Sequence, residues 1–417
     1  MPPANHGIDQ MMLKTQALAA AVAALVASAG STAEAQITAP REAAQIAFGP
    51  VSIYPILQIV DAGRDENVFN DGGLPQEDYT FTLASKVLAV VRLGNNELLF
   101  QTGNDYVWFQ RYEHERSNNA QYAMRFNLSA SRFKPFVGVE HTRTRARRTP
   151  EIDARARRLE RAVVGGINFD VTPRMSLTAS ARLDDSTYND GEVFRGVELD
   201  TALSRTGRTF DGGLRYAITP LTTLSMLAGY EEQTFPESHV RDLRRYTAGP
   251  TVEFSPDAIL RGRASVVLER FSPDDPTLGE RTGVAYLAGL NWSMFGRTAF
   301  DVTAGRNINY SYLETEPYYL LSNARVSVGQ PIFGPVHVYG GYDWEHMAYK
   351  WSRGFGLPAA GRDRVDTMKS ASAGVGVNFG RGFSMRIGLE KTRRRSVEDP
   401  RQNFDRMRVL STVTVGS

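Results

Sequence analysis

The residues best suited to binding chemistry form a run of arginines between positions 143 and 161. Seven of them are candidates to line a constriction: Arg143, Arg145, Arg147, Arg148, Arg155, Arg157 and Arg158. Guanidinium groups at this density would attract an anionic solute or a uronic polysaccharide if the segment folded into a pore. They would bind lipopolysaccharide phosphates if the segment lay outside the pore. A solvated loop is the third interpretation, and the sequence leaves all three open.

An acidic group lies earlier in the chain and consists of Asp61, Asp65, Glu66, Asn67 and Asp71. Oxygen ligands at this spacing could hold Ca²⁺. However, Asn70 stands where the calcium-binding loop of an EF-hand requires glycine. A solvated turn rich in Asp and Asn is therefore the favoured interpretation. We expect no metal site and no cofactor.

Two histidines have acidic neighbours that could orient a catalytic base: His114 between Glu113 and Glu115, and His346 near Asp343. No G-x-S-x-G nucleophile motif, phosphate-binding glycine loop or zinc-spaced histidine pair accompanies them. The sequence therefore predicts that the chain is not an enzyme. An enzyme at the rim of a membrane barrel is the least favoured alternative.

Alternating side chains from Val51 onward predict the elements that would position these residues. Between Met175 and Asp184, apolar residues alternate strictly with polar ones, and residues 371–379 and 383–390 repeat the pattern. Strands of a soluble β-sandwich average five or six residues, whereas these segments reach the nine or more that a tilted membrane strand needs. One face could then lie in hydrocarbon and the other in water.

The connections between these segments alternate in length. Tight turns are expected at eight places: 93–96, 130–131, 172–174, 219–220, 255–257, 294–296, 333–335 and 380–382. Longer polar loops lie between consecutive turns, as at 61–77, 145–158, 185–205, 348–365 and 395–403. This pattern predicts an all-β protein: a transmembrane antiparallel up-and-down β-barrel of about 18 strands. Sixteen strands are possible, because residues 132–144 and 197–219 alternate poorly.

Aromatic residues gather near both ends of the expected strands. Those near the tight turns are Phe169, Tyr216, Phe254, Trp292, Phe295, Phe333, Phe379 and Phe383. Those near the longer loops are Trp108, Tyr230, Tyr310, Tyr318 and Trp344. Two such bands are typical of the interfacial girdles of membrane barrels. A barrel of this size encloses a lumen too wide for side chains to fill, which indicates a channel unless something plugs it.

Composition and the first residues indicate export. The 48 basic and 46 acidic residues nearly cancel, so no nucleic-acid partner is expected, and there is no cysteine. Residues 1–35 are predicted to be an N-terminal extension with a cleaved signal peptide that ends at Ala33-Glu34-Ala35. Residues 36–50 would be a periplasmic lead-in and residues 51–417 the barrel. The expected location is the outer membrane of a Gram-negative cell.

Two short motifs carry a resemblance to a known family. One is Asp65-Glu66-Asn67-Val68-Phe69, which follows an extended segment containing Ile53-Tyr54-Pro55. The other is a strand–turn–strand hairpin at residues 214–222. Both resemble the β-barrel porin type 2 family, including its exopolysaccharide-export-associated members. The resemblance implies an outer-membrane location and an association with exopolysaccharide production or export, and it brings no catalytic residues. The chain departs from many outer-membrane barrels in ending at Gly416-Ser417 without a terminal aromatic residue.

We therefore expect a porin-like channel, which on the resemblance would support exopolysaccharide export or secretion. The alternative from a different class is a non-conducting structural or surface-interaction barrel. Expected partners are outer-membrane lipid and lipopolysaccharide, the barrel assembly machinery, and a polysaccharide or small polar solute.

Overall fold

The computed structural model describes residues 44–295, 297–349, 364–380 and 382–416. Within this part of the chain, one sheet contains 19 strands, of which β1 (Ile46–Phe48) has only three residues. The other 18 are β2–β8 and β11–β21. Because β2 (Val51–Asp65) pairs with β21 (Phe404–Gly416), the 18 strands close into an antiparallel barrel. The prediction of about 18 strands is confirmed.

The long strands follow one another around the ring in chain order, and the short β9 (Val193–Phe194) and β10 (Val197–Glu198) pair separately. The remaining bounds are β3 Asp78–Leu93, β4 Asn96–Phe109, β5 Ser117–Asn127, β6 Phe133–Thr144, β7 Arg158–Thr172, β8 Met175–Tyr188, β11 Arg205–Thr219, β12 Thr222–Thr234, β13 Leu243–Phe254, β14 Leu260–Pro273, β15 Arg281–Met294, β16 Thr298–Tyr310, β17 Tyr318–Phe333, β18 Val336–Tyr349, β19 Val365–Gly380 and β20 Phe383–Ser396. Among the described residues, no helix is long and apolar enough to span a membrane.

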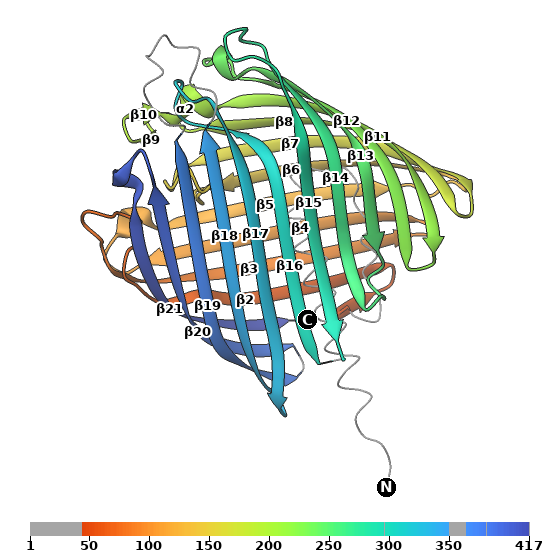
Figure 1. Cartoon of the computed structure of the whole chain (residues 1–417). Coiled ribbons are helices and arrows are strands. Elements are labelled where there is room, and N and C mark those ends of the chain that lie inside the picture. Colours follow the sequence, from red (N-terminus) through yellow and green to blue (C-terminus); the bar gives the residue numbers. More distant parts are fainter. Residues whose placement is uncertain (1–43, 296, 350–363, 381, 417) are drawn as a thin grey trace.

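All eight predicted tight turns connect neighbouring strands. We call their end of the barrel the turn end and the opposite end, with the longer connections, the loop end. Figure 1 shows the tilted strands, with the short helix α2 (Leu199–Leu203) at the loop end. The predicted loop 348–365 lies mostly outside the described residues.

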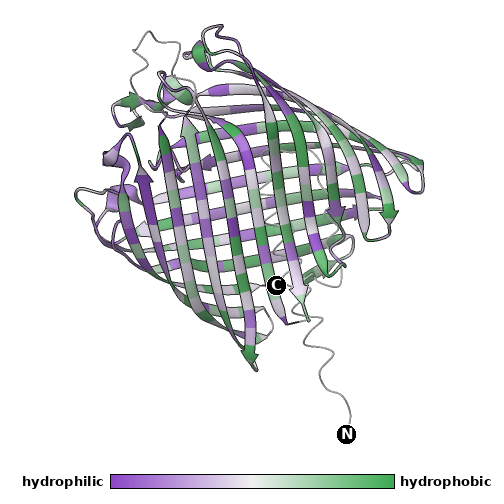
Figure 2. Ribbon diagram, in the orientation of Figure 1, coloured by the Kyte–Doolittle hydropathy of each residue, from purple (hydrophilic) through white to green (hydrophobic). Residues whose placement is uncertain are grey.

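The two faces of the sheet differ as the alternation predicts (Figure 2). On β20 the outward Ile387 and Leu389 are 48% and 51% exposed, as expected for side chains that hydrocarbon covers. Inward charges pair across strands, as in Arg182–Glu140 at 2.7 Å and Arg215–Glu253 at 2.5 Å. Ion pairs of this kind neutralise the charged side chains on the inner, water-facing surface of the barrel.

The two segments that alternate poorly adopt different structures. Residues 133–144 form β6, a full strand. Residues 197–219 are only partly strand, because β10 and α2 occupy positions 197–203 before β11 begins at Arg205. The predicted loop 185–205 therefore contains a helical turn of its own.

The prediction of an aromatic girdle is wrong for Tyr310 and Tyr318. Tyr318 is fully buried with its ring centroid 4.7 Å from that of Phe271, and the Tyr310 ring lies 4.6 Å from the Arg205 guanidinium. Pairing of β15 with β16 stops at Arg306, whereas pairing of β16 with β17 continues to Tyr310. The loop end of the β16–β17 hairpin thus leaves the wall and packs against residues inside the barrel.

The seam between the first and last strands includes residues of the predicted lead-in. β21 covers the edge of β2 from Ile56 to Asp65, and β1 pairs with residues 51–53 on the same strand. β1 therefore continues the line of β21 toward the turn end. The predicted signal peptide lies outside the described residues.

Tyr339 on β18 lies across two glycines of the neighbouring strands, Gly374 on β19 and Gly388 on β20. A Cβ atom at Gly388 would overlap the Tyr339 hydroxyl group and lie 2.9 Å from the Ala373 carbonyl oxygen. Glycine leaves room here for an aromatic side chain to cover the strand.

We predict that Gly388→Ala destabilises the barrel by about 1–3 kcal/mol, since overpacking forces neighbouring groups to shift. Gly329→Ala is the matched control, because a Cβ there meets no atom within 4 Å. Urea unfolding in lipid vesicles, followed by heat-modifiable gel mobility, measures the difference. Equal unfolding midpoints for the two variants would contradict this packing.

Candidate functional site

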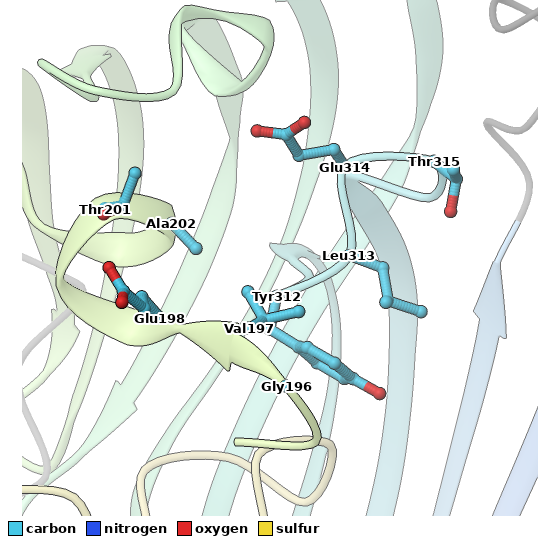
Figure 3. A pocket seen from close by; sticks show the side chains of 9 residues that line it. All are labelled: Gly196, Val197, Glu198, Thr201, Ala202, Tyr312, Leu313, Glu314 and Thr315. Atoms are coloured by element: carbon cyan, nitrogen blue, oxygen red, sulfur yellow. The ribbon is translucent and has the colours of Figure 1, made fainter. Parts of the chain in front are cut away.

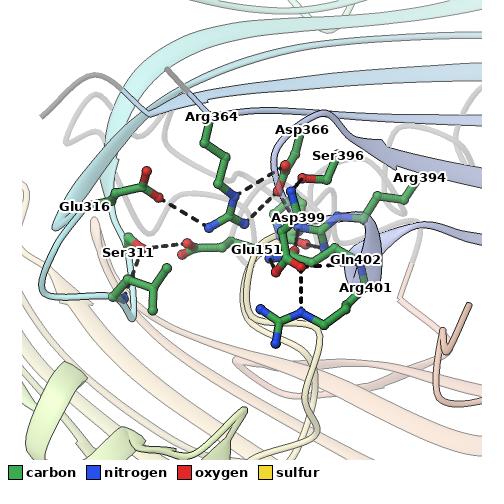
Figure 4. A network of polar contacts seen from close by, with 12 residues as sticks. Glu151, Ser311, Glu316, Arg364, Asp366, Arg394, Ser396, Asp399, Arg401 and Gln402 are labelled. Atoms are coloured by element: carbon green, nitrogen blue, oxygen red, sulfur yellow. Dashed lines mark hydrogen bonds and ion pairs between the residues drawn. The ribbon is translucent and has the colours of Figure 1, made fainter. Parts of the chain in front are cut away.

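The segment 145–157, which we call the inner loop, joins β6 to β7 and crosses the loop end of the barrel. The Pro150 carbonyl oxygen accepts a hydrogen bond of 2.6 Å from Arg394 on β20. The Glu151 carboxylate accepts one of 2.6 Å from the Ser311 hydroxyl group, in the connection between β16 and β17. Both partners lie on the far side of the strand ring from β6 and β7. The inner loop therefore spans the opening of the barrel at the loop end, which we call the mouth. Figure 4 shows the contact between Glu151 and Ser311.

The inner loop is also tied to segments that precede it in the chain. Arg147 donates a 2.6 Å hydrogen bond to the Val68 carbonyl oxygen, and Asp153 accepts one of 2.6 Å from Asn70. Arg155 donates to the Ser117 hydroxyl group at 2.7 Å. These contacts tie the loop to the first two long connections of the barrel, so it is anchored at both ends of its span.

The seven candidate arginines divide into two groups. Arg145, Arg147, Arg148, Arg155 and Arg158 have side chains only 10–28% exposed. Arg143 lies on the exposed outer face of β6 on the same side as Val139, and the Arg157 side chain is 59% exposed. The structure brings five of the seven into the mouth and leaves these two outside it.

The five inner arginines bind groups of the protein itself. Arg148 donates to the Ser186 hydroxyl group at 2.9 Å and to Glu160 at 3.1 Å. Arg158 donates to the Ala146 carbonyl oxygen at 2.7 Å. Arg145 contacts the carbonyl oxygens of His114 and Arg155. Since hydrogen bonds from a charged donor are stronger than neutral ones, these contacts hold the loop in its inward conformation.

A hydrophobic cluster joins three connections at the loop end. Its buried members, which we call the mouth cluster, are Ile152, Ala156, Tyr188, Leu199, Ala202, Leu203 and Tyr312. They come from the inner loop, β8, α2 and the β16–β17 connection. A cavity of about 390 Å³ lies beside the cluster between residues 196–202 and 312–315 (Figure 3). Apolar burial therefore supports the same inward arrangement as the arginine contacts.

Arg241, in the connection between β12 and β13, is fully buried and contacts the inward β16–β17 connection. It donates to the carbonyl oxygens of Ser311 at 2.9 Å and of Tyr312 at 2.8 Å. Sequence reasoning missed Arg241, Ser311 and Arg394. Their partners are backbone groups or residues far away in sequence, so no local motif marks them.

The family-like motif at Asp65–Phe69 shapes the first connection. Asp65 binds the Arg406 guanidinium on β21, with one contact of 2.8 Å. The Asn67 side chain donates to the Asp71 carbonyl oxygen at 2.7 Å. Val68 is buried, and the Phe69 ring packs edge-on against Tyr112 at 4.7 Å. The motif therefore fastens the β2–β3 connection across the seam of the barrel.

The rest of the acidic group has similar structural partners. Asp61 lies at a β-bulge with a positive φ of 54° and is 3.7 Å from Arg408. Asp71 accepts hydrogen bonds from the backbone N–H groups of Gly73 and Leu74, which lower the pKa of its carboxyl group. Among the described residues, no three His, Asp or Glu side chains form a group that could hold a metal ion.

The structure separates the histidines from the proposed catalytic neighbours. His346 stacks on Trp344 and faces outward, whereas Asp343 faces inward and pairs with Arg325. The His114 side chain is 72% exposed and lies 3.5 Å from Glu115, which also binds Arg145 and Arg155. Thr367, on the outer face, places its hydroxyl group 3.4 Å from His346.

Glu151 is the fully buried carboxyl group at the far end of the inner loop. Burial raises its pKa from the ordinary 4.5 to about 7. The Ser311 hydroxyl group, Arg364, Tyr349 and Arg394 favour the charged form and limit the rise. Asp366 on β19 neutralises part of that attraction, since it binds Arg364 at 2.8 Å and Arg394 at 2.9 Å.

Comparisons with known proteins identify one matching family and several similar solved structures. A model of the family described as "Putative beta-barrel porin 2" matches residues 39–417. No curated protein matches the chain in a sequence search.

Similar solved structures include Pseudomonas aeruginosa OccK2 (OpdF), with a TM-score of 0.49 and 11% identity over 87% of this chain and 98% of that one. A BenF-like porin from Pseudomonas fluorescens has a TM-score of 0.48 and 11% identity over 88% and 99%. Acinetobacter baumannii OccAB4 has a TM-score of 0.45 and 10% identity over 88% and 98%.

We predict that the inner loop docks more weakly as the pH rises from about 4.5 to about 7. The docked Glu151 holds its proton more tightly than a solvated carboxyl group, so docking is strongest in acid and loses up to about 3 kcal/mol above pH 7. Hydrogen exchange of residues 145–157, corrected for intrinsic rates, should increase between pH 5 and pH 8.

Glu151→Gln removes the titrating group, so exchange in this variant should stay slow at both pH values. Glu192→Gln is the control, because that carboxyl group lies 4.0 Å from the exposed Arg157 at the rim. It should keep the pH dependence of the wild type. The same dependence in Glu151→Gln would contradict the assignment to Glu151.

Proposed function

Because the chain belongs to the "Putative beta-barrel porin 2" family, we propose that polar solutes diffuse through its lumen and that the inner loop narrows this path. One observation carries the proposal: a chain segment is anchored on both sides of the mouth, at Ser117 on one side and at Ser311 on the other. A solute that enters from the loop end must pass beside this segment. The constriction would consist of the inner loop and the wall strands that it does not reach.

The inner wall favours polar solutes of either charge. Several of its arginines have acidic partners, such as Arg408 with Glu390 at 2.5 Å and Arg245 with Glu269 at 3.1 Å. Balanced pairs keep the lumen hydrated without a strong field of one sign. We therefore propose weak charge selectivity.

Exopolysaccharide export is the finer proposal, and it rests on the family resemblance. An extruded sugar polymer needs a continuous wide path, and the contacts of Pro150 and Glu151 cross that path. Export would thus require the inner loop to leave the mouth. Small polar solutes would pass beside it without this movement.

A non-conducting structural barrel is the second candidate, and the mouth cluster favours it. Three connections share one buried apolar cluster, which resists opening. In this case the loop-end surface would bind a partner. Electrical conductance separates the two candidates.

We also propose the processing of the N-terminus and the route to the membrane. Residues 1–35 would be removed on export, residues 36–50 would lie in the periplasm, and the barrel assembly machinery would insert residues 51–417 into the outer membrane. N-terminal sequencing of the mature protein tests the cleavage, with Gln36 as the expected first residue.

We predict that replacing residues 146–156 by a short Gly-Ser linker raises single-channel conductance in planar bilayers several-fold, because it removes the segment that spans the mouth. Arg147→Ala combined with Arg155→Ala should give a smaller increase or frequent fluctuations, since it releases one anchor of the loop. The control is Arg143→Ala combined with Arg157→Ala, which removes two exposed arginines of the same segment and should leave conductance unchanged.

Equal conductance of the wild type and the linker variant would reject the inner loop as the constriction. Absence of stepwise conductance in both would favour the structural barrel. Heat-modifiable gel mobility must show that each variant is folded.

A further inference from the structure

The outward face of β20 changes from apolar to basic along its length. Outward positions near the turn end are Phe383, Met385, Ile387 and Leu389, and those that follow are Lys391, Arg393 and Arg395. A tilted strand rises by roughly 2.5 Å per residue along the membrane normal, so Arg393 lies about 25 Å above Phe383. This height equals that of the apolar band of a membrane barrel. The cations therefore lie where the outer leaflet's headgroups begin.

Four cations gather at this height, and we call them the basic outer patch: Lys369, Lys391, Arg393 and Arg395. Lys369 on β19 lies directly opposite Arg393 in the strand register. A single carboxylate, that of Asp405 on β21, binds both Arg393 and Arg395 at 2.7 Å. Among the described residues, no carboxylate lies within 4.0 Å of Lys369 or Lys391. Four cations against one carboxylate leave an excess of positive charge.

Several other exposed arginines at the loop end have a carboxylate partner, although Arg111 shares Glu77 with Arg64. Arg64 pairs with Glu77 at 2.6 Å, and Arg244 pairs with Asp274 at 2.7 Å. Arg270 pairs with Glu280 at 2.7 Å. These pairs neutralise the rim within the protein. The basic outer patch lacks such compensation, so its charge is available to an anionic partner.

An apolar groove of about 570 Å³ lies on the same strands, toward the turn end from the patch. Its outward side chains are Val338, Ala373, Val375, Ile387, Leu389 and Val409. Small residues keep it open, since Ala373 and the backbones of Gly374 and Gly388 form part of its floor. Figure 2 shows the corresponding change on β20 and β21, which are more hydrophilic toward the loop end.

Trp344 lies beside the basic outer patch. It lies on β18 directly opposite Lys369 and faces outward. Tryptophan prefers the boundary between hydrocarbon and headgroups, where its ring is apolar and its N–H group is polar. The basic outer patch thus lies at that boundary, and the groove lies on its hydrocarbon side.

We propose that the outer face of β18–β21 binds one phosphorylated lipid of the outer leaflet, with its phosphate groups on the basic outer patch and an acyl chain in the groove. Arginine and lysine bind phosphate through charge-assisted hydrogen bonds, and the guanidinium fork matches phosphate geometry. A free phosphate ion would leave the groove unused, and an uncharged lipid would leave the patch unpaired. Both surfaces together fit an anionic glycolipid.

The proposal rests on the outer-membrane placement of the barrel and does not require an open lumen. Native mass spectrometry of the purified full-length protein with diphosphorylated lipid A tests it. The wild type should retain one lipid per barrel, and Lys391→Gln combined with Arg393→Gln should lower the affinity by about tenfold or more. The matched control is Arg244→Gln combined with Arg270→Gln, which also removes two loop-end cations and should bind as the wild type does.

Three outcomes would overturn the lipid site. One is equal binding by the two double variants, another is equal binding of phosphatidylethanolamine and lipid A, and the third is displacement of lipid A by millimolar inorganic phosphate, which would indicate a simple anion site. Bilayer conductance of the Lys391→Gln/Arg393→Gln variant should equal that of the wild type. A missing lipid site and a missing channel would thus give different results.

Discussion

The structure depends on one constraint: a backbone in hydrocarbon must pair all of its N–H and C=O groups with itself. A sheet meets this requirement only if its first and last strands join, and here β2 pairs with β21 along residues 56–65. β1 then pairs with the part of the β2 edge that β21 does not reach. Closure leaves no free edge on that strand. It also fixes which side chains face lipid and which face the interior.

In the interior of the closed ring, charged side chains can form hydrogen bonds with other parts of the protein. Arginines of the wall and of the connections donate to carbonyl oxygens of inward segments, as Arg394 does to Pro150 and Arg241 does to Ser311. Such bonds satisfy groups that would otherwise be buried without partners. The same alternation places apolar residues outside, and near the loop end this outer face ends in the basic outer patch. One periodicity therefore produces both the narrowed mouth and the surface proposed to bind lipid.

The sequence predicted much of the fold because the signals for turns and strands lie in residues that are neighbours in the chain. Turn residues such as Thr172-Pro173-Arg174 and Phe333-Gly334-Pro335 mark the hairpins, and period-two alternation marks the strands between them.

The arginine run also pointed to the inner loop, and five of its seven arginines lie in the mouth. Arg143 does not, because its parity on β6 turns it outward. The anchors could not be predicted, since the bond from Arg394 to the Pro150 carbonyl oxygen depends on how the ring closes. Tyr310 and Tyr318 were misplaced for a similar reason: their hairpin bends away from β15.

Cross-linking of the first and last strands tests closure most directly, and the chain has no native cysteine to interfere. Leu57 and Val415 are Cα partners across the seam. Leu57→Cys combined with Val415→Cys should form a disulfide in intact outer membranes, and Leu57→Cys combined with Val409→Cys, six positions away along β21, should not. A folded protein in which the first pair stays reduced under oxidising conditions, or in which both pairs cross-link equally, would contradict the closed barrel.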